Sequence, residues 1–359
     1  MDRPIFIIGS GRSGTTLLRN MLNAHPRIHI AFEPHFYWYR ALFRTRRPAR
    51  ELLDFYFQSP HFRWQRVDPN RVLAQLPSPL GREHLGEAFA AVLRERAARY
   101  GRVRFGDKTP ANAAALKTIF ADFPECRAIH IVRDPRATAA SLARMPWAPA
   151  SLMINASYLD IERKQVAKFR DRMLPIRLED LLAEPRATMT RVLDFVEEPW
   201  HDDVLDHARH QPDKDDVPPY PWLERAGGVR DDAGARGGAA GAGWGELTPV
   251  QIRMIEQITK RVMAGAGYKP AELAKEPRWI SVFWAGISEI PRFFPLAARG
   301  LWLWFKARKP ERLDWAERYV LTHTNPAAWA RYPGYELPTA PPLAALTAGD
   351  MKTALPSDA

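Results

Sequence analysis

The chain has 359 residues, of which 46% are hydrophobic, and it carries a formal net charge of +11. Its length allows one large α/β domain with additions, and its single cysteine, Cys126, excludes a disulfide framework and a cysteine-based metal site. No helix-turn-helix, zinc-finger or RNA-binding signature accompanies the positive charge, so we expect no nucleic-acid partner.

The first predicted element is a strand over residues 4–9, which leads through a Gly/Ser/Thr loop into a helix over 14–24. From Pro4 to Leu22 this segment reads PIFIIGSGRSGTTLLRNML. Backbone N–H groups of such a loop and of the first helical turn converge, and the helix dipole adds partial positive charge there. The segment therefore predicts a binding site for a ligand that carries phosphate.

The spacing of the glycines narrows the kind of ligand. Gly9 and Gly14 fit the nucleoside-triphosphate loop G-x-x-x-x-G-K-[ST], but Thr15 replaces the lysine that reaches the β- and γ-phosphates. A cation stands earlier in the loop instead, as Arg12. Gly9, Gly11 and Gly14 also fit the dinucleotide pattern G-x-G-x-x-G, but no acidic residue follows a second predicted strand to bind a ribose. A magnesium-NTP hydrolase and a dinucleotide site are both disfavoured.

The loop sequence RSGTTL resembles the 5′-phosphosulfate loop of sulfotransferases that use 3′-phosphoadenosine 5′-phosphosulfate (PAPS). The branch that it most resembles carries Arg-Ser-Gly-Thr-Thr, as the tyrosylprotein sulfotransferases and many bacterial enzymes do. The resemblance extends over about residues 4–268. The residues that it assigns to cofactor binding in this loop are Gly11, Arg12, Ser13, Gly14, Thr15 and Thr16.

Sulfuryl transfer needs a base for the acceptor's proton and cations for the charge on the sulfuryl and leaving oxygens. The resemblance implies Glu33 as the base, because the tyrosylprotein branch has a glutamate at a matching distance from its loop arginine. His35 is the alternative, since other branches use a histidine. We favour Glu33, whose apolar neighbours are expected to raise its pKa by desolvation, whereas His35 needs no such tuning near neutral pH. We expect the segment 31–35 to be irregular.

Residues 36–100 carry apolar side chains at helical spacing, and we expect this stretch to be a helical insertion that binds the acceptor. A predicted strand follows over 103–106. Lys108 lies in the turn after it, in the sequence GDKTP. The resemblance implies that Lys108 contacts the transferring group and shares the neutralisation of charge with Arg12.

A second motif, RAIHIVRDPRATAASLARM over 127–145, supports the first. It predicts a buried strand over 127–132 and a helix over 136–144. In the family that the glycine loop resembles, the matching arginine and serine bind the 3′-phosphate of the cofactor, which implies this role for Arg133 and Ser141. The chemistry is suitable, because a guanidinium forms bidentate hydrogen bonds to phosphate.

The remaining elements continue the alternation of strands and helices. We predict a strand at 174–178 and helices at 111–122, 150–171, 185–196 and 248–265. This alternation predicts an α/β fold with a parallel sheet flanked by helices, and the resemblance implies the P-loop NTPase-like sulfotransferase fold. We assign residues 1–271 to this domain.

A linker rich in Pro, Asp and Gly is predicted over 211–247. Within it, Arg236-Gly237-Gly238 resembles a degenerate form of the family's Arg-Lys-Gly element near the 3′-phosphate. A flexible loop without a ligand is an equal alternative for Arg236 and Gly237. If Arg236 and Gly237 do contact the cofactor, the glycine-rich linker would close over the bound cofactor as a lid.

Residues 272–332 form a tryptophan-rich, mainly helical C-terminal extension, and 333–359 form a tail that we expect to be disordered. The apolar stretch 279–305 contains Glu289 and Arg292, which argues against a membrane-spanning helix. Its aromatic residues beside Arg and Lys suit packing on the domain or a homodimer contact. They equally suit peripheral contact with a membrane surface or a lipid substrate.

The sequence therefore predicts a sulfotransferase that moves the sulfuryl group from PAPS to a hydroxyl or amine of a small-molecule, carbohydrate or lipid acceptor, with no metal required. One alternative is a P-loop small-molecule kinase, which would need the missing loop lysine. Another is a non-catalytic nucleotide- or membrane-binding protein, which would leave Arg12, Glu33 and Lys108 unexplained. The first predicted strand follows no secretory leader, which favours the cytoplasm, with the inner membrane surface as a peripheral site. The alanine, arginine and proline content suggests a bacterial source.

Overall fold

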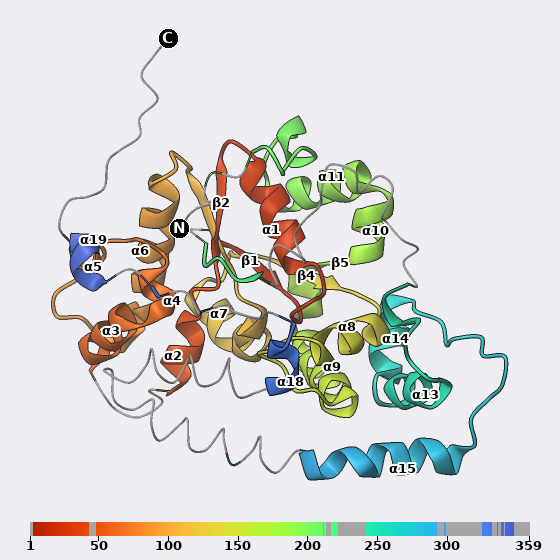
Figure 1. Ribbon diagram of the computed structural model, residues 1–359. Coiled ribbons are helices and arrows are strands. Elements are labelled where there is room, and N and C mark those ends of the chain that lie inside the picture. The colour runs from red at the N-terminus through yellow and green to blue at the C-terminus, as the bar shows by residue number, and fades with distance from the viewer. Residues whose placement is uncertain are drawn as a thin grey trace.

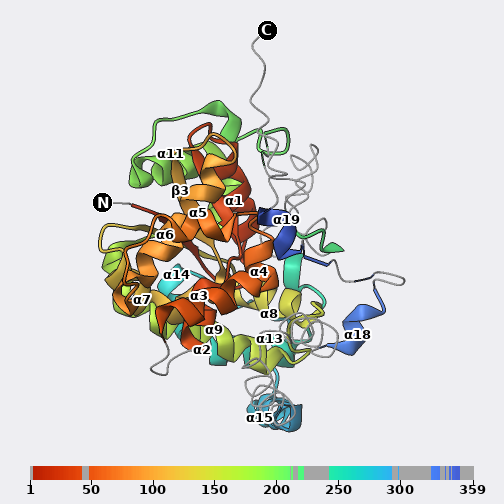
Figure 2. The ribbon, with the colours of Figure 1, turned by 90° about the vertical axis from the view of Figure 1, so that its left-hand side faces the viewer.

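The computed structural model contains a five-stranded parallel sheet with helices on both faces (Figures 1 and 2). The strand order is β2-β3-β1-β4-β5, so the first strand lies in the centre. The predicted α/β class is thus confirmed. The residues that the structure describes are 3–42, 48–210, 212, 217–221, 242–292, 298, 325–331, 336, 339–340 and 342–347.

The strands and helices alternate along most of the chain. The strands are β1 Ile5–Ile8, β2 Ile28–Phe32, β3 Arg104–Lys108, β4 Arg127–Val132 and β5 Met173–Arg177. The helices of the first half are α1 Thr15–Ala24, α2 Phe36–Leu42, α3 Ala49–Gln58, α4 Pro60–Arg63, α5 Pro69–Leu73, α6 Leu85–Ala98, α7 Leu116–Asp122 and α8 Pro135–Ala143. Those of the second half are α9 Leu152–Val166, α10 Leu178–Ala183, α11 Pro185–Val196, α13 Pro249–Ile258, α14 Lys260–Ala266, α15 Trp279–Glu289, α18 Pro326–Trp329 and α19 Leu343–Thr347.

Alternate residues of the central strand face opposite layers of the molecule, as the period of a strand requires. Ile5 and Ile7 are fully buried and pack with side chains of α1 and α11. Phe6 and Ile8 belong to a second cluster that includes side chains of α2 to α7. Because both faces are covered, β1 consists of apolar residues without alternation.

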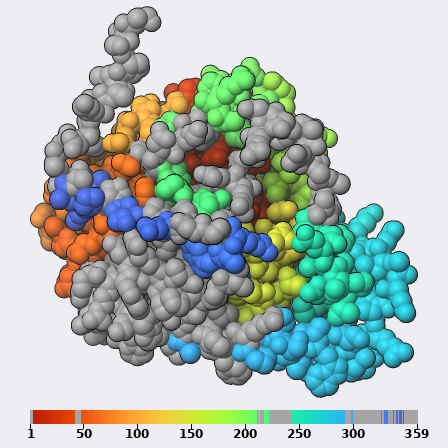
Figure 3. Space-filling view, viewed as in Figure 1, coloured from red at the N-terminus to blue at the C-terminus, as the bar shows by residue number. Residues whose placement is uncertain are grey.

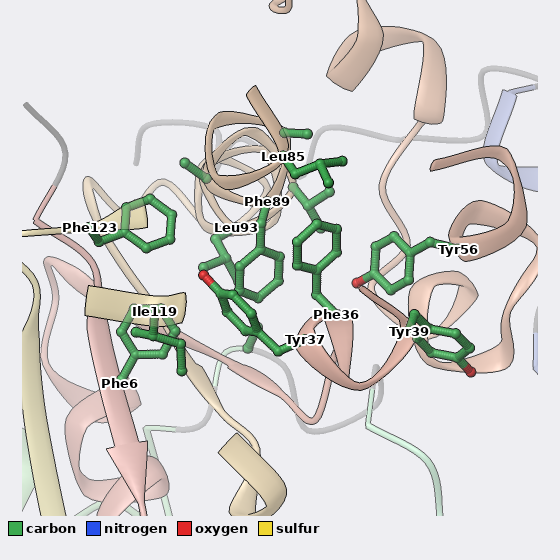
Figure 4. Close-up of a cluster of buried hydrophobic side chains, with 14 of the residues drawn as sticks. Phe6, Phe36, Tyr37, Tyr39, Tyr56, Leu85, Phe89, Leu93, Ile119 and Phe123 are labelled. Carbon is green, nitrogen blue, oxygen red and sulfur yellow. The ribbon is translucent and has the colours of Figure 1, made fainter. Parts of the chain in front are cut away.

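The described residues of the stretch 36–100 are mainly helical, as predicted, and helices α2 to α6 form one covering layer of the sheet. Its aromatic side chains make a continuous cluster that reaches Phe6 of β1 (Figure 4). The rings of Phe36 and Phe89 are stacked with their centroids 4.6 Å apart, and the Tyr37 ring meets Phe89 edge-on at 5.5 Å. This layer therefore shares the core of the sheet.

Strand β2 takes in residues 31 and 32 of the segment 31–35 that the sequence predicts to be irregular, whereas 33–35 have no regular secondary structure, as predicted. The strand pairs in parallel with β3 over its whole length, with Phe32 opposite Lys108. Within the described residues no strand pairs with its outer edge; instead Asn23 of α1 accepts the Ile30 N–H at 2.6 Å, and Asn23 and Arg19 both donate to the Ile30 carbonyl. The sequence signal is weak because side chains, rather than a second neighbouring strand, complete this edge.

Several predicted boundaries also differ. The strand that was expected at 103–106 extends to Lys108, which is therefore its last residue and not part of the following turn. A 3₁₀ helix, η2, precedes α7 within the predicted helix 111–122, and another, η3, follows α9 within 150–171. The predicted helix 248–265 is divided at Thr259 into α13 and α14.

The C-terminal extension is described in parts. Helix α15 packs on α13 and contains the buried Val282, and it lies at the edge of the molecule in both ribbon views (Figures 1 and 2). The stretch 279–305 lies within the described residues only at 279–292 and 298. Within the predicted tail, α19 places Leu343 and Leu346 against the aromatic cluster. No helix in the described part of the chain has the length and apolarity that crossing a bilayer takes.

The stacked Phe36–Phe89 pair leads to a stability prediction. We expect Phe89→Ala to lower the free energy of unfolding by about 3–5 kcal/mol, because it removes a fully buried ring and leaves a cavity. Urea unfolding followed by circular dichroism measures this change. The matched control is Val103→Ala, at a side chain that is 62% exposed, which should stay within about 0.5 kcal/mol of the parent. Equal effects of the two substitutions would contradict the prediction.

Candidate active site

Four predicted site segments meet at one edge of the sheet. All the strand pairs are parallel, so the carboxyl ends of the strands lie along the same edge, where ligands bind in open α/β sheets. The glycine loop follows β1, Glu33 follows β2, Lys108 ends β3 and Arg133 follows β4. The fold therefore brings together residues that are far apart in the sequence.

The glycine loop has a backbone that other residues would strain. Gly9 has a φ of 152°, and a Cβ there would lie 2.4 Å from the carbonyl oxygen of Ile131. Gly14 has a φ of 96°, and a Cβ there would lie 2.6 Å from Cδ1 of Leu178. Arg12 also has a positive φ, of 71°, which an arginine adopts only when its surroundings impose it. The loop is therefore held in one shape by the strands and helices around it.

Helix α1 begins directly after this loop. Its N-cap is Gly14, which has no side chain to accept from the first N–H groups, and its first turn contains no acidic residue. The first four N–H groups of any α-helix lack partners within the helix, and the helix dipole makes this end positive. Thr15 is buried and Thr16 is half-buried at this end. With Ser13, whose hydroxyl donates to the Ser10 carbonyl at 2.7 Å, they lie where the sequence placed them.

Two arginines and a serine from the two predicted motifs are in contact. Nε of Arg12 donates to Oγ of Ser141 at 3.1 Å, and Nη1 of Arg133 donates to the Arg12 carbonyl at 3.2 Å. Burial lowers the pKa of Arg133, but a guanidinium stays charged at neutral pH. The motif after β1 and the motif after β4 thus bring two guanidinium groups and a hydroxyl together.

The 3₁₀ helix η6, Ala242–Trp244, packs beside this site. A Cβ at Gly243 would lie 2.7 Å from Nη2 of Arg133, so a side chain there would displace the end of the Arg133 side chain. Gly243 was not among the predicted site residues, although it ends the glycine-rich stretch that the sequence indicates. Arg236 and Gly237, the predicted cofactor contacts in that stretch, lie outside the described residues.

Glu33, His35 and Lys108 form the second part of the site. Nζ of Lys108 donates to Oε1 of Glu33 at 2.6 Å, and Nε2 of His35 lies 3.5 Å from Oε2 of the same carboxylate. The Lys108 ammonium also lies 3.8 Å from the centroid of the Phe32 ring. Glu33 and His35 both have positive φ angles, 44° and 52°. Unfavourable backbone geometry of this kind concentrates at functional sites.

The charge state of Glu33 differs from the expectation. Burial raises its pKa, as predicted, but the Lys108 ammonium and the hydrogen bond from His35 together lower the pKa well below its ordinary value. For Lys108, burial lowers the pKa, and the Glu33 carboxylate opposes that shift. In this state Glu33 is an ionised partner of Lys108 and a weak base, and the prediction of a raised pKa is wrong.

The side chains of His61 and Tyr39, which the sequence did not indicate, lie next to His35. The rings of His35 and His61 lie 4.3 Å apart, and the Tyr39 hydroxyl lies 2.8 Å from Nδ1 of His61. Burial lowers the pKa of His61 well below its usual value, so this ring is neutral at neutral pH. Gln65 ties the group to β2 by donating to the carbonyls of His61 and Phe32. A pair of histidines, one in the loop after β2 and one in α4, has no local sequence signal.

A buried carboxyl anchors the turn after β3. Asp107 is fully buried and accepts hydrogen bonds from Thr109 Oγ1 at 2.7 Å and from Asn112 Nδ2 at 2.6 Å. Burial raises the pKa of Asp107 to about 6, against those two bonds. The sequence GDKTP that drew attention to Lys108 therefore also contains the residue that fixes its turn.

Comparisons with known proteins find similarity to sulfotransferases. A family model described as the sulfotransferase family matches residues 4–202. Protein-tyrosine sulfotransferase 1 of Danio rerio is 30% identical over 219 residues, which cover 57% of this chain and 56% of that protein. The protein-tyrosine sulfotransferase of Drosophila melanogaster is 26% identical over 222 residues, 56% of this chain and 40% of that protein. Among solved structures, the sulfotransferase domain from the curacin biosynthetic pathway aligns with 76% of this chain and 99% of its own, at a TM-score of 0.48 and 18% identity.

The chain belongs to the sulfotransferase family, since the family model matches more than half of it. Both motifs that carry the resemblance, the glycine loop and the segment 127–145, lie inside the matched residues. The predicted family is therefore confirmed. The chain spans about half the length of the two curated relatives.

The Lys108–Glu33 pair leads to a prediction about titration. We expect Lys108→Met to raise the pKa of Glu33, because the ammonium is gone while burial, which raises the pKa, remains. Carbon-13 NMR of the labelled glutamate carboxyls, followed over pH, measures the shift. Lys117→Met, at an exposed lysine, is the matched control and should leave Glu33 unchanged. An unchanged titration in Lys108→Met would show that Lys108 does not set the charge of Glu33.

Proposed function

We propose that this member of the sulfotransferase family transfers the sulfuryl group of PAPS to a hydroxyl or amine of an acceptor, releasing 3′-phosphoadenosine 5′-phosphate (PAP). The observation that carries the proposal is the placing of two cations and a carboxylate, Arg12, Lys108 and Glu33, after neighbouring parallel strands. Family membership supports the same activity.

The residues present fit an anionic donor. The glycine loop and the uncapped start of α1 offer N–H groups for the 5′ end, and Arg12 adds a charge there. Arg133 and Ser141 are the residues that would hold the 3′-phosphate, because a guanidinium and a hydroxyl are both suited to phosphate oxygens. No group of three or more His, Cys, Asp or Glu side chains suited to a metal ion is found in the described part of the chain.

The donor, when bound, supplies an activated sulfuryl group on a phosphate leaving group. Lys108 and Arg12 stabilise negative charge on the sulfuryl and leaving oxygens. In the free protein, Lys108 is engaged by Glu33. When a nearby anion competes for the ammonium, the attraction between Lys108 and Glu33 weakens. The pKa of Glu33 then rises, because burial raises it and Lys108 lowers it less. This exchange converts Glu33 into a better base at the step that requires one.

The proton acceptor is Glu33 in this proposal, with His35 as the specific alternative. His35 is an alternative base because its ring nitrogen lies 3.5 Å from the Glu33 carboxylate. This pair resembles the carboxylate–imidazole arrangement in which the carboxylate orients the ring. In either case the two side chains act at the same place.

The acceptor is a hydroxyl or amine of a small molecule, carbohydrate, lipid or peptide. The names of the curated relatives make a tyrosine hydroxyl the first to test. The helical stretch 36–100 is proposed to bind the acceptor because it begins directly after Glu33 and His35.

We further propose a cytoplasmic location. Helix α15 is the proposed element for membrane-surface or homodimer contact, since Trp279, Phe283 and Trp284 are exposed on it. A kinase is disfavoured because Thr15 stands at the position of the phosphate-loop lysine.

Donor binding is the first test. Calorimetric titration should show micromolar binding of PAP and little or no binding of ATP with magnesium. Arg133→Ala should weaken PAP binding by about 10- to 100-fold, the effect of losing charged hydrogen bonds, and Ser141→Ala should weaken it less. Arg163→Ala on α9, which pairs with Asp160, is the matched control and should bind PAP like the parent. Preference for ATP would contradict the proposal.

The pH dependence of turnover distinguishes the two candidate bases. With Glu33 as the base, Glu33→Gln should lower kcat by about 10²- to 10⁴-fold, because a positioned base contributes that much. The loss of kcat in His35→Asn, expressed as a logarithm, should be less than a tenth of the loss in Glu33→Gln. His35→Asn should also keep the acidic limb of the pH profile of kcat. His210→Asn, at a histidine outside the site, is the control. The opposite ranking of the first two variants would assign the proton to His35.

A further inference from the structure

A C-terminal segment far outside the family-matched residues is attached to the helix that carries Ser141. Asn325 is 3% exposed, and its Nδ2 donates to the carbonyls of Ala143 at 3.0 Å and Met145 at 3.1 Å. These carbonyls lie at the end of α8, where the last carbonyl groups of a helix have no partner within it. Asn325 therefore takes the place of a helix cap from a distance of 180 residues in the sequence.

The same segment adds an aromatic contact next to that helix end. Trp329 of α18 packs with Tyr220 and Trp147 against the small buried cluster of Leu142, Met145 and Ala148. Ala328, the neighbour of Trp329, is 4% exposed. Tyr220 and Trp329 both lie beyond residue 202, the end of the family match. Only Trp147 of the three rings belongs to the matched part of the chain.

Trp147 in turn touches the glycine loop. A Cβ on Gly11 would lie 2.6 Å from Cη2 of Trp147, and Gly11 is not among the glycines with positive φ. A glycine is needed there for space, since the indole ring lies directly on the loop backbone. The next residue is Arg12, which has a φ of 71° and reaches Ser141. In the space-filling view, red N-terminal residues lie in a hollow whose described rim includes blue C-terminal residues (Figure 3).

We infer that the segment 325–329 is a positioning element of the donor site. Asn325 bonds the Met145 carbonyl, and Trp329 packs on the cluster of Leu142, Met145 and Ala148 against which Trp147 also packs. Through this shared cluster they hold Trp147 against Gly11, and Trp147 keeps the loop in the shape that directs Arg12 toward Ser141. A positive φ at a residue other than glycine persists only where its surroundings impose it, and this packing is part of those surroundings. The identification of PAP as the ligand rests on the proposed function. The inference that the segment 325–329 supports the glycine loop does not.

Two measurements on the full-length chain test this inference. The variants are Asn325→Ala and Trp329→Ala, with Trp329→Phe as the conservative replacement. The matched control is Trp279→Ala, which removes a tryptophan of the same extension that is 74% exposed. The first measurement is the affinity for PAP by calorimetry, and the second is amide hydrogen exchange of residues 9–18 by mass spectrometry.

We expect Asn325→Ala and Trp329→Ala to weaken PAP binding by about 5- to 20-fold, the effect of losing one or two neutral hydrogen bonds or an equivalent contact. Exchange in the loop should become faster in the same variants, while Trp329→Phe and Trp279→Ala should resemble the parent in both. A general loss of structure would accelerate exchange in β1 and β4 as well. In that case the comparison of Trp329→Phe with the parent decides the inference.

The outcomes separate this inference from the proposed function. Parental PAP affinity together with parental loop exchange in both alanine variants would overturn the inference and leave the proposed function intact. If the parent binds no PAP, the proposed function fails, and loop exchange alone decides the inference. Faster exchange in Trp279→Ala equal to that in Trp329→Ala would also overturn it, because the effect would not depend on the cluster that Trp329 shares with Trp147.

Discussion

The ion pair between Lys108 and Glu33 links the register of the sheet to the chemistry at its edge. Lys108 is 1% exposed, and an ammonium buried to this degree requires a partner. Glu33 provides it because Phe32 lies opposite Lys108, and the Glu33 N–H continues the ladder by donating to the Lys108 carbonyl at 3.0 Å. A shift of β2 by one residue would reverse the faces of its side chains and remove the carboxylate from the ammonium. The position of an edge strand therefore sets the charge state of the candidate base.

Helix α1 makes that position depend on the same element that begins the donor site. Its N-terminal turn follows the glycine loop, while Arg19 and Asn23 in its later turns bond the outer edge of β2 at Ile30. One helix thus begins at the glycine loop and holds the strand that ends just before Glu33. The glycine loop and the Lys108–Glu33 pair are joined by a single element of secondary structure.

Local and long-range contacts explain what could be predicted from the sequence. The glycine loop and the Arg133 motif were predicted correctly because each is a contiguous strand–turn–helix segment whose residue types follow from its own geometry. Strand β2 was missed because α1 side chains complete its edge, and His61 was missed because its contact with His35 joins helix α4 to the loop after β2. The pKa of Glu33 was predicted with the wrong sign because burial is readable from apolar neighbours, whereas a partner 75 residues away is not.

The described parts of the C-terminal extension have different relations to the domain. Helix α15 packs on α13, buries Val282 and leaves Trp279, Phe283 and Trp284 exposed, so its composition alone allowed several roles. The segment that begins at Asn325 instead satisfies two specific carbonyl groups, and a buried amide is stable only when such bonds are made. An extension that served only as an external contact would have no need to complete the end of the helix that carries Ser141. The boundary of the family match at residue 202 is therefore not the boundary of the structural unit around the donor site.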